Sequence, residues 1–441
     1  MNKPKIKSQI KDSKNKKNKN STNSETDSKA EINKFKKNVA KLSLMIFAAV
    51  ASYLFYFLMA RMLTIEDYGL LYSLIALTYL FTVPHETIRT VIAKYTVDLA
   101  AKKEYGKIKG FFLKAVKTIL IYSAIAFVIF LGLLPLLMNL LHAPIVPLII
   151  VGSSLLVTFL LPIIWGLLQG LQSFGHLGLN NSIETAIKLI IAVVLVLIGL
   201  GINGALIAIP VSIAAAFFIG FWPLKKVMKA KAEPFKEKHI VRYSMAAFII
   251  FLFFVAMYSV DTIAMRYFFS AKTSGLYGSI SVIGKIVLFV SIVINRVMFS
   301  AVAEQRASKS KDKEKKARKL LMSAFFYVLA VTAFFLVISL FAPNTLIKIV
   351  VGSKYLEIAS NLKYMIIAMG LLSLSSLIIF YNLSLDWNKK LTARILGVFL
   401  FLQIALFIVF HRTLQQFINI ILIVNVLLFL ALLATLLIRK K

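Results

Sequence analysis

Seven charged side chains interrupt stretches of this sequence that are otherwise apolar. A charge at the middle of a bilayer costs about 2.5–3.5 kcal/mol on the insertion scale, so each must face water or an opposite charge. Side chains of this kind bind ions or one another, and a surplus of cations among them suits an anionic ligand. The seven are Glu86, Arg89, Glu184, Lys188, Asp261, Lys285 and Lys363.

Spacing along a helix predicts partners for four of these side chains. Glu86 and Arg89 are three residues apart, and Glu184 and Lys188 are four apart with the acid first, the better order on a helix. Both pairs are open to two interpretations: ion pairs that only hold helices together, or groups that take part in ion coupling.

Lys285 has no acid within a turn of its own helix and lies near the middle of an apolar stretch. An unpaired ammonium there requires an anionic ligand, a counter-ion or a partner on another helix, such as Asp261. Asp261 itself lies one turn and a residue before Arg266, near the end of its own span. The sequence therefore leaves open whether Lys285 is paired or binds a ligand.

Composition makes the chain a polytopic membrane protein. It is 59% apolar with a mean hydropathy of +0.84, more than a soluble core of 441 residues could bury. The absence of cysteine excludes disulfides and thiolate chemistry. The sequence has no phosphate-binding loop, no nucleophile elbow and no His/Glu cluster with metal spacing. We therefore expect no enzymatic activity, no metal and no cofactor.

A bilayer-length window predicts twelve transmembrane helices in an all-α fold. Most of the 52 lysines and arginines fall in the N-terminal segment, the C-terminus and alternate connections, which predicts that both termini are cytosolic. The net charge of +34 follows from this distribution and needs no nucleic acid. The predicted spans are 41–61, 68–93, 114–140, 146–169, 180–200, 203–224, 241–265, 275–298, 320–342, 356–382, 392–411 and 416–438.

The twelve spans divide into two groups of six that share a motif. The segment ARMLTIEDYGLLYSL (60–74) is echoed by AMRYFFSAKTSGLYGSI (264–280), with Gly275 lying 206 positions after Gly69. Parallel six-helix repeats are a transporter architecture with the pathway between the lobes. The predicted parts are a disordered Lys-rich cytosolic tail (1–38), an N-terminal lobe (39–226), a basic linker (227–240) and a C-terminal lobe (241–441). The tail either binds anionic lipid or only keeps this end soluble and sets the topology.

Four segments resemble polysaccharide-biosynthesis exporters, the Wzx-type oligosaccharide flippases of the multidrug/oligosaccharidyl-lipid/polysaccharide (MOP) superfamily, which are MATE-like in fold. Ala60, Arg61, Leu63, Tyr68 and Gly69 match the family's pattern "A-R-x-L-x-x-x-x-Y-G-x-Y", with Tyr72 one place late. The other three similar segments are WGLLQGLQSFG (165–175), SVDTIAMRYFFSAKTSGLYGSI (259–280) and IKIVVGSKYLEIASNLKY (347–364).

The resemblance implies two six-helix lobes around a cavity that opens alternately to each side of the cytoplasmic membrane. It implies a polyprenyl-diphosphate-linked oligosaccharide as substrate, with cations of the cavity contacting the diphosphate. It also suggests a glycan polymerase or transferase as a partner. On the matching helices, the candidate substrate-binding residues are Arg61, Arg89, Arg266 and Lys285.

Two alternatives remain. A multidrug or organic-cation antiporter of the same superfamily would use buried carboxylates, but the first helix has no acid and the cavity is predicted to be net basic. A membrane scaffold that recruits glycan enzymes without transport would not need the charges inside the spans.

Overall fold

The computed structural model describes residues 52–234, 245–307, 313–385 and 387–437, and every element within them is helical. Eight helical segments of this part of the chain are long and apolar enough to cross a membrane, and a ninth candidate is a bent pair. The predicted all-α polytopic fold is therefore confirmed. The Lys-rich tail and part of the predicted linker lie outside the described residues.

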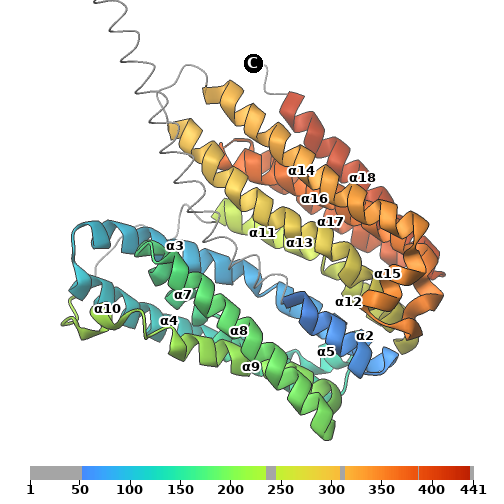
Figure 1. Cartoon of the computed structure of the whole chain (residues 1–441), viewed down its shortest axis with the longest axis horizontal. Helices are drawn as coiled ribbons and strands as arrows, with labels where there is room; N and C mark the ends of the chain where they lie inside the picture. Colours follow the sequence, from blue (N-terminus) through green and yellow to red (C-terminus); the bar gives the residue numbers. More distant parts are fainter. Residues whose placement is uncertain (1–51, 235–244, 308–312, 386, 438–441) are drawn as a thin grey trace, which may run out of the picture.

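The first helical bundle contains the described residues up to 234 (Figure 1). It begins with helical residues 52–62, and its most extensive helix packing is between α3 and α7 and between α8 and α9. We call it the first bundle. Its further elements are α2 (Ile65–Tyr79), α3 (Thr82–Ala101), α4 (Tyr105–Gly132), α5 (Leu134–Leu141), α6 (Ile145–Thr158), α7 (Leu161–Gly170), α8 (Phe174–Leu195), a π-helical turn (Val196–Leu200), α9 (Gly201–Ile219) and α10 (Lys225–Lys229).

The second bundle contains the described residues from 245 onward, with α13 and α16 packed along each other at its centre. Its helices are α11 (Met245–Met257), α12 (Val260–Phe268), α13 (Ala271–Ala307), α14 (Lys313–Phe341), α15 (Pro343–Val350), a 3₁₀ segment (Ser353–Asn361), α16 (Leu362–Ser384), α17 (Lys389–Val409) and α18 (Leu414–Leu437). In Figure 1 the ribbons of the two bundles meet near α2, α12 and α15 and diverge toward the opposite end.

The predicted count of twelve spans is not confirmed, because several spans are broken or joined. The first predicted span begins outside the described residues, and the second is divided between α2 and α3. The fifth and sixth form one segment, Phe174–Ile219, that reverses at Gly199 (φ 94°), a conformation that glycine adopts without a steric penalty. The seventh is α11 followed by α12, bent by 40°.

The two glycines of the repeated motif touch each other where the bundles meet. A Cβ atom on Gly69 of α2 would lie 2.6 Å from the backbone nitrogen of Gly275 at the start of α13. A Cβ on Gly275 would lie 1.9 Å from the carbonyl oxygen of Ile65. Only glycine permits backbones to approach this closely. The motif occurs twice, and its two copies build one contact between the bundles.

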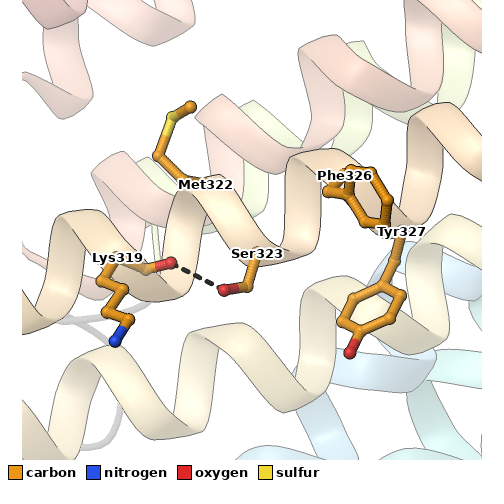
Figure 2. A pocket seen from close by; sticks show the side chains of 5 residues that line it. All are labelled: Lys319, Met322, Ser323, Phe326 and Tyr327. Atoms are coloured by element: carbon orange, nitrogen blue, oxygen red, sulfur yellow. Dashed lines mark hydrogen bonds between the residues drawn. The ribbon is translucent and has the colours of Figure 1, made fainter.

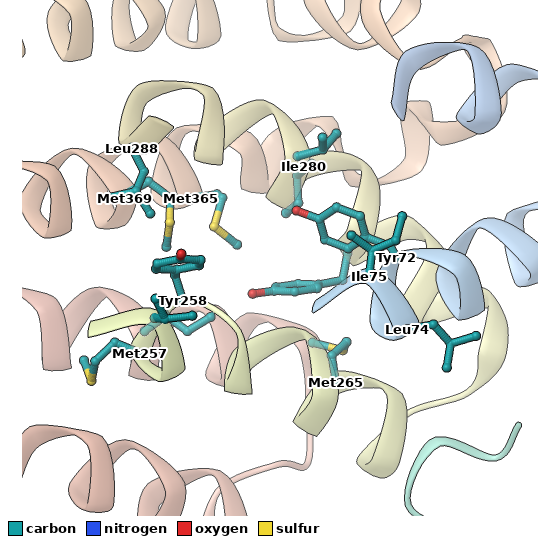
Figure 3. Close-up of a cluster of buried hydrophobic side chains, with 14 of the residues drawn as sticks. Tyr72, Leu74, Ile75, Met257, Tyr258, Met265, Ile280, Leu288, Met365 and Met369 are labelled. Carbon is teal, nitrogen blue, oxygen red and sulfur yellow. The ribbon is translucent and has the colours of Figure 1, made fainter. Parts of the chain in front are cut away.

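Apolar and aromatic side chains fill the space next to this glycine contact. Figure 3 shows Tyr72 and Ile75 of α2 facing Ile280 of α13, with Met265 of α12 and Met365 of α16 nearby. These side chains belong to a buried cluster with members from both bundles. The bundles are thus joined by packed side chains, and the charged residues described next lie around that packed region.

Candidate functional site

Lys285 of α13 and Asp261 of α12 form a buried ion pair inside the second bundle. The Lys285 Nζ atom lies 3.1 Å from both carboxylate oxygens of Asp261, and each side chain is only 1% exposed. Thr262 donates its backbone N–H to Asp261 at 2.7 Å, and Tyr277 donates its hydroxyl at 2.6 Å. The carboxylate therefore has several donors, as a buried charge requires.

The same pair faces the first bundle. Lys285 Nζ lies 5.5 Å from the ring centre of Tyr72, a cation–π contact from α2. The hydroxyl of Tyr53 donates to the Lys285 carbonyl at 3.0 Å. Lys285 is therefore placed at the contact between the bundles, with its ammonium group occupied by Asp261, Thr262 and Tyr72.

Glu86 of α3 binds two arginines, and one of them, Arg296, joins it to the second bundle. The Glu86 Oε2 atom lies 3.1 Å from Arg89 on the same helix, and its Oε1 atom lies 2.9 Å from Arg296 on α13. One carboxylate is thus shared by two guanidinium groups, so the three side chains carry a net positive charge. Arg89 is 14% exposed, whereas Glu86 and Arg296 are 37% and 46% exposed.

Arg61 and Lys354 bind backbone carbonyls across the bundle contact. Arg61 donates to the carbonyls of Lys348 (3.4 Å) and Ile349, in the last turn of α15. In the opposite direction, Lys354 donates to the carbonyls of Arg61 (3.4 Å) and Leu63, at the end of the helical residues 52–62. The last carbonyls of a helix have no partner within the helix and carry the negative end of its dipole, which favours cations.

Arg266 makes a third contact of the same kind. Its Nε atom donates to the carbonyl of Leu141 at 2.8 Å, and an Nη atom donates to the carbonyl of His142 at 3.2 Å, at the end of α5. Each of these three cations thus caps the end of a helix in the other bundle. We call Arg61, Arg266 and Lys354 the carbonyl clasp.

Glu184 and Lys188 lie apart from these groups, on α8. The Lys188 Nζ atom is 3.4 Å from Glu184 Oε1, and Ser212 of α9 donates its hydroxyl to the same oxygen at 3.2 Å. The contacts stay within the first bundle. This geometry fits the interpretation in which the pair holds α8 and α9 together, and their role in ion coupling stays a prediction.

The predicted site residues therefore occupy three places instead of one. Lys285 and Asp261 are buried together, Arg89 and Glu86 lie in the cluster with Arg296, and Arg61 and Arg266 belong to the clasp. Two participants did not stand out in the sequence, Arg296 and Lys354, because each lies in or beside a connection between predicted spans, where a charge is unremarkable. One sequence feature could have identified Arg296 as a candidate. It lies eleven residues after Lys285, a spacing that places both on the same face of one helix.

Neither a metal site nor the hollow on the surface of α14 contributes to this arrangement in the part of the chain that the structure describes. Among the described residues, no three His, Asp or Glu side chains gather as metal ligands would. A hollow of about 300 Å³ on the surface of α14 is lined by five side chains of that single helix, as Figure 2 shows. Met322, Phe326 and Tyr327 in it are exposed, as expected for a surface against lipid tails.

Comparisons with known proteins concern the family and the fold of this chain. A family model described as polysaccharide biosynthesis protein matches residues 58–360. An uncharacterized membrane protein of Methanocaldococcus jannaschii is 26% identical over 284 residues, which is 59% of this chain and 64% of that protein. This chain thus spans less than two thirds of that relative.

Two solved structures share the fold. A lipid II flippase, MurJ, in an inward closed conformation is 15% identical with a TM-score of 0.69, over 90% of this chain and 87% of that chain. An inward-facing multidrug resistance MATE transporter of the MOP superfamily is 12% identical with a TM-score of 0.68, over 87% and 92%. Identities this low establish the fold only.

Proposed function

Because the chain belongs to the polysaccharide biosynthesis protein family and has the MOP transporter fold, we propose that it flips a polyprenyl-diphosphate-linked oligosaccharide across the cytoplasmic membrane. The predicted resemblance to this family is confirmed. The substrate, the membrane and the orientation belong to the proposal. Transport proceeds by alternating access, in which the bundles separate first at one end and then at the other.

The observation that carries the proposal is the convergence of cations from both bundles on their contact region. Arg61 and Arg89 come from the first bundle, and Arg266, Lys285 and Arg296 come from the second. A diphosphate crossing the bilayer requires such groups, because an unpaired charge in hydrocarbon is costly. Guanidinium groups suit it best, since their fork of donors binds two phosphate oxygens at once.

The position of the clasp supports an orientation in which the clasped end of the protein faces the outside. In the described conformation this end is closed. The connections that contribute to the clasp, after residue 60 and around residues 141, 266 and 348–354, carry few basic residues. By the positive-inside rule these connections face away from the cytosol. The substrate would then enter from the cytosolic end, where it is assembled. Both solved structures reported above are described as inward conformations.

The antiporter alternative requires an acid inside the spans that is free to bind a cation, and the two such acids at the bundle contact are held by cations. Asp261 pairs with Lys285, and Glu86 has two cationic partners, Arg89 and Arg296. The three side chains around Glu86 therefore carry a net positive charge, which repels an organic cation.

A reconstitution experiment tests the proposal. The protein in liposomes should move a fluorescent lipid-linked sugar to the far leaflet, measured as protection from a membrane-impermeant quencher. Arg89→Ala and Lys285→Ala should both lose translocation while still inserting into the membrane. Lys107→Ala removes only an exposed ion pair with Glu104 and should keep translocation. Wild-type rates in both test variants would show that these cations have no part in transport, whereas no translocation by the unaltered protein would favour the scaffold alternative.

A further inference from the structure

The short helix α10 packs one face on the first bundle and presents lysines on the other. Leu224 and Val227 are each only 1% exposed, in a buried cluster that includes residues of α4. The segment WPLKKVMKAKA (222–232) contains four lysines and no acid. The helix is therefore fixed to the protein on its apolar side, and its charged side is turned outward. The exposed lysines of this helix are Lys225, Lys226 and Lys229.

The chain that follows α10 is held against the start of α4 by close backbone contacts. The Glu233 N–H donates to the carbonyl of Gly106 at 3.0 Å, and a Cβ atom on Gly110 would overlap the Glu233 carbonyl oxygen. The Lys109 Nζ atom donates to the Met228 carbonyl at the end of α10, at 2.6 Å. The exposed lysines of α10 thus stand on a surface that is fixed from both sides.

Two aromatic rings beside these lysines indicate their depth in the membrane. The Lys226 Nζ atom lies 4.6 Å from the ring centre of Tyr105, the first residue of α4. The Lys225 Nζ atom lies 5.9 Å from the ring centre of Trp222, which is 62% exposed. Rings with an apolar body and a polar tip are enriched at the boundary between hydrocarbon and headgroups. The lysines beside them therefore lie at the level of the lipid headgroups.

The outward face of α4 gives the same depth from a second observation. Lys114 and Lys117 are exposed on it, and from Leu120 to Ile129 its exposed side chains are apolar or aromatic. A change from lysines to apolar side chains along one exposed helix face marks the edge of the hydrocarbon, since lysine keeps its ammonium group in the polar layer. The contact of α10 with Tyr105 lies on the polar side of that edge.

We propose that Trp222, Lys225, Lys226 and Lys229, which we call the α10 surface, bind the headgroups of anionic lipids. The lysines supply positive charge at headgroup depth with no acid in the segment, and Trp222 packs on the first part of the acyl chain. In Figure 1, α10 lies at the end of the first bundle, away from the ribbons of the second. The site is therefore independent of the proposed substrate pathway. A headgroup bound there holds the start of the connection between the bundles at the membrane surface.

Quenching of Trp222 by brominated lipids measures which lipid lies beside α10. With Trp165→Phe and Trp387→Phe, the full-length protein keeps Trp222 as its one tryptophan. Two nanodiscs of phosphatidylcholine with a small fraction of phosphatidylglycerol are compared. In one the phosphatidylglycerol carries bromine on its acyl chains, and in the other an equal amount of phosphatidylcholine does. Random mixing quenches equally in both, whereas the α10 surface should enrich phosphatidylglycerol by roughly fivefold or more, the effect of one lysine near an anionic surface.

Removal of the charges tests the lysines themselves. Lys225→Gln/Lys226→Gln/Lys229→Gln should lower the enrichment nearly to one, and arginine at the same three positions should keep it, because the charge is kept. Salt at about 1 M, where the screening length is about 3 Å, should lower it in the protein with all its lysines. Both faces of a nanodisc have the same lipids, so these results do not depend on the orientation of the protein in the membrane.

The matched control removes three exposed lysines from the second bundle, on α14. It should keep the enrichment at Trp222, because the same total charge is lost at another place. Equal quenching by the two brominated lipids in the protein with all its lysines would show that the α10 surface has no preference and would overturn the inference. An equal loss of enrichment in the control would overturn it as well, since only total charge would then matter. The control variant is Lys315→Gln/Lys316→Gln/Lys319→Gln.

A second measurement keeps all three tryptophans, because Trp165 donates to Asn180 at 2.8 Å and its replacement removes that hydrogen bond. A ligand that binds the folded state raises the unfolding temperature. Phosphatidylglycerol should therefore raise the unfolding temperature of the unaltered protein more than that of the α10 variant with three glutamines. In phosphatidylcholine alone the two proteins should unfold at the same temperature, because the replaced side chains are exposed. Equal rises in the two proteins would contradict the site.

Discussion

The Lys285–Asp261 pair shows how much a single buried charge depends on its partner. Both side chains are out of contact with solvent, so removing one leaves the other charged in an apolar surrounding. Lys285→Met should lower the free energy of unfolding by about 3–5 kcal/mol. The double variant Lys285→Met/Asp261→Leu should recover most of that loss. Denaturant unfolding in mixed micelles measures both.

The double variant also separates structural from functional roles. If Lys285 contacts the substrate during transport, the double variant folds but does not move the lipid-linked sugar. A double variant that transports at the wild-type rate would reduce the pair to a packing role. A double variant as unstable as Lys285→Met would mean that the loss comes mainly from Tyr277 and Thr262, whose donors to Asp261 are left without an acceptor.

At the scale of helices, the glycine contact between α2 and α13 sets how closely the bundles approach. Gly275→Ala places a methyl group against the Ile65 carbonyl at 1.9 Å, so one backbone must move. We expect a loss of about 1–3 kcal/mol in unfolding free energy and slower translocation. Gly175→Ala, where nothing lies within 4 Å of the added atom, is the matched control. Equal stability of the two variants would show that this approach does not matter.

The same contact shows what the sequence can predict and where such prediction ends. The motif around Gly69 and Gly275 predicted two related halves, because its residues recur in order. It did not predict that the two copies touch, since sequence spacing carries no information on which helices pack together. The broken spans were not predicted for a related reason: hydropathy is continuous across Leu80 and across Gly199. The helix is interrupted at Gly199 by a positive φ, and after α2 by hydrogen bonds of Leu80 and Phe81 to the third preceding residue instead of the fourth.

The charged residues show the same limit of what the sequence can predict. Long apolar stretches revealed Arg89, Lys285 and Asp261, because a charge inside them is conspicuous. Arg61 and Arg266 were also identified, but their present partners are carbonyls at helix ends, which every helix has and no sequence pattern marks. Arg296 and Lys354 were counted with the loops because they lie within a few residues of one. The roles assigned to all of these residues stay predictions until variants are measured.

At the scale of the whole molecule, the carbonyl clasp and the Glu86 cluster lie at different depths between the bundles. The clasp joins residues near the ends of α5, α15 and the helical residues 52–62, whereas Glu86 and Arg296 lie along α3 and α13. Alternating access requires one set of contacts to break while another holds. In the proposed transport cycle, the clasp is the set of contacts that opens for release on the outer side.

Opening of the clasp can be followed with cysteine labelling, because the chain has no cysteine of its own. Ser274 is buried beside the contact of Gly69 with Gly275, so Ser274→Cys should react slowly with a membrane-impermeant maleimide added outside. Adding Arg61→Gln and Lys354→Gln removes two caps worth about 0.3–1 kcal/mol each. The open population, and with it the labelling rate, should rise roughly threefold to thirtyfold, since the two caps together are worth about 0.6–2 kcal/mol and 1.4 kcal/mol is a factor of ten.

The control for this experiment is Lys272→Gln, an exposed cation two residues before Ser274 that pairs with Glu357 within the second bundle. It alters the local charge without touching the clasp, so labelling should stay at the Ser274→Cys rate. A faster rate in that control as well would mean that charge near the reporter, and not separation of the bundles, governs access. Fast labelling of Ser274→Cys alone would mean that this end is open to the outside in the membrane, which contradicts the closed state inferred for it.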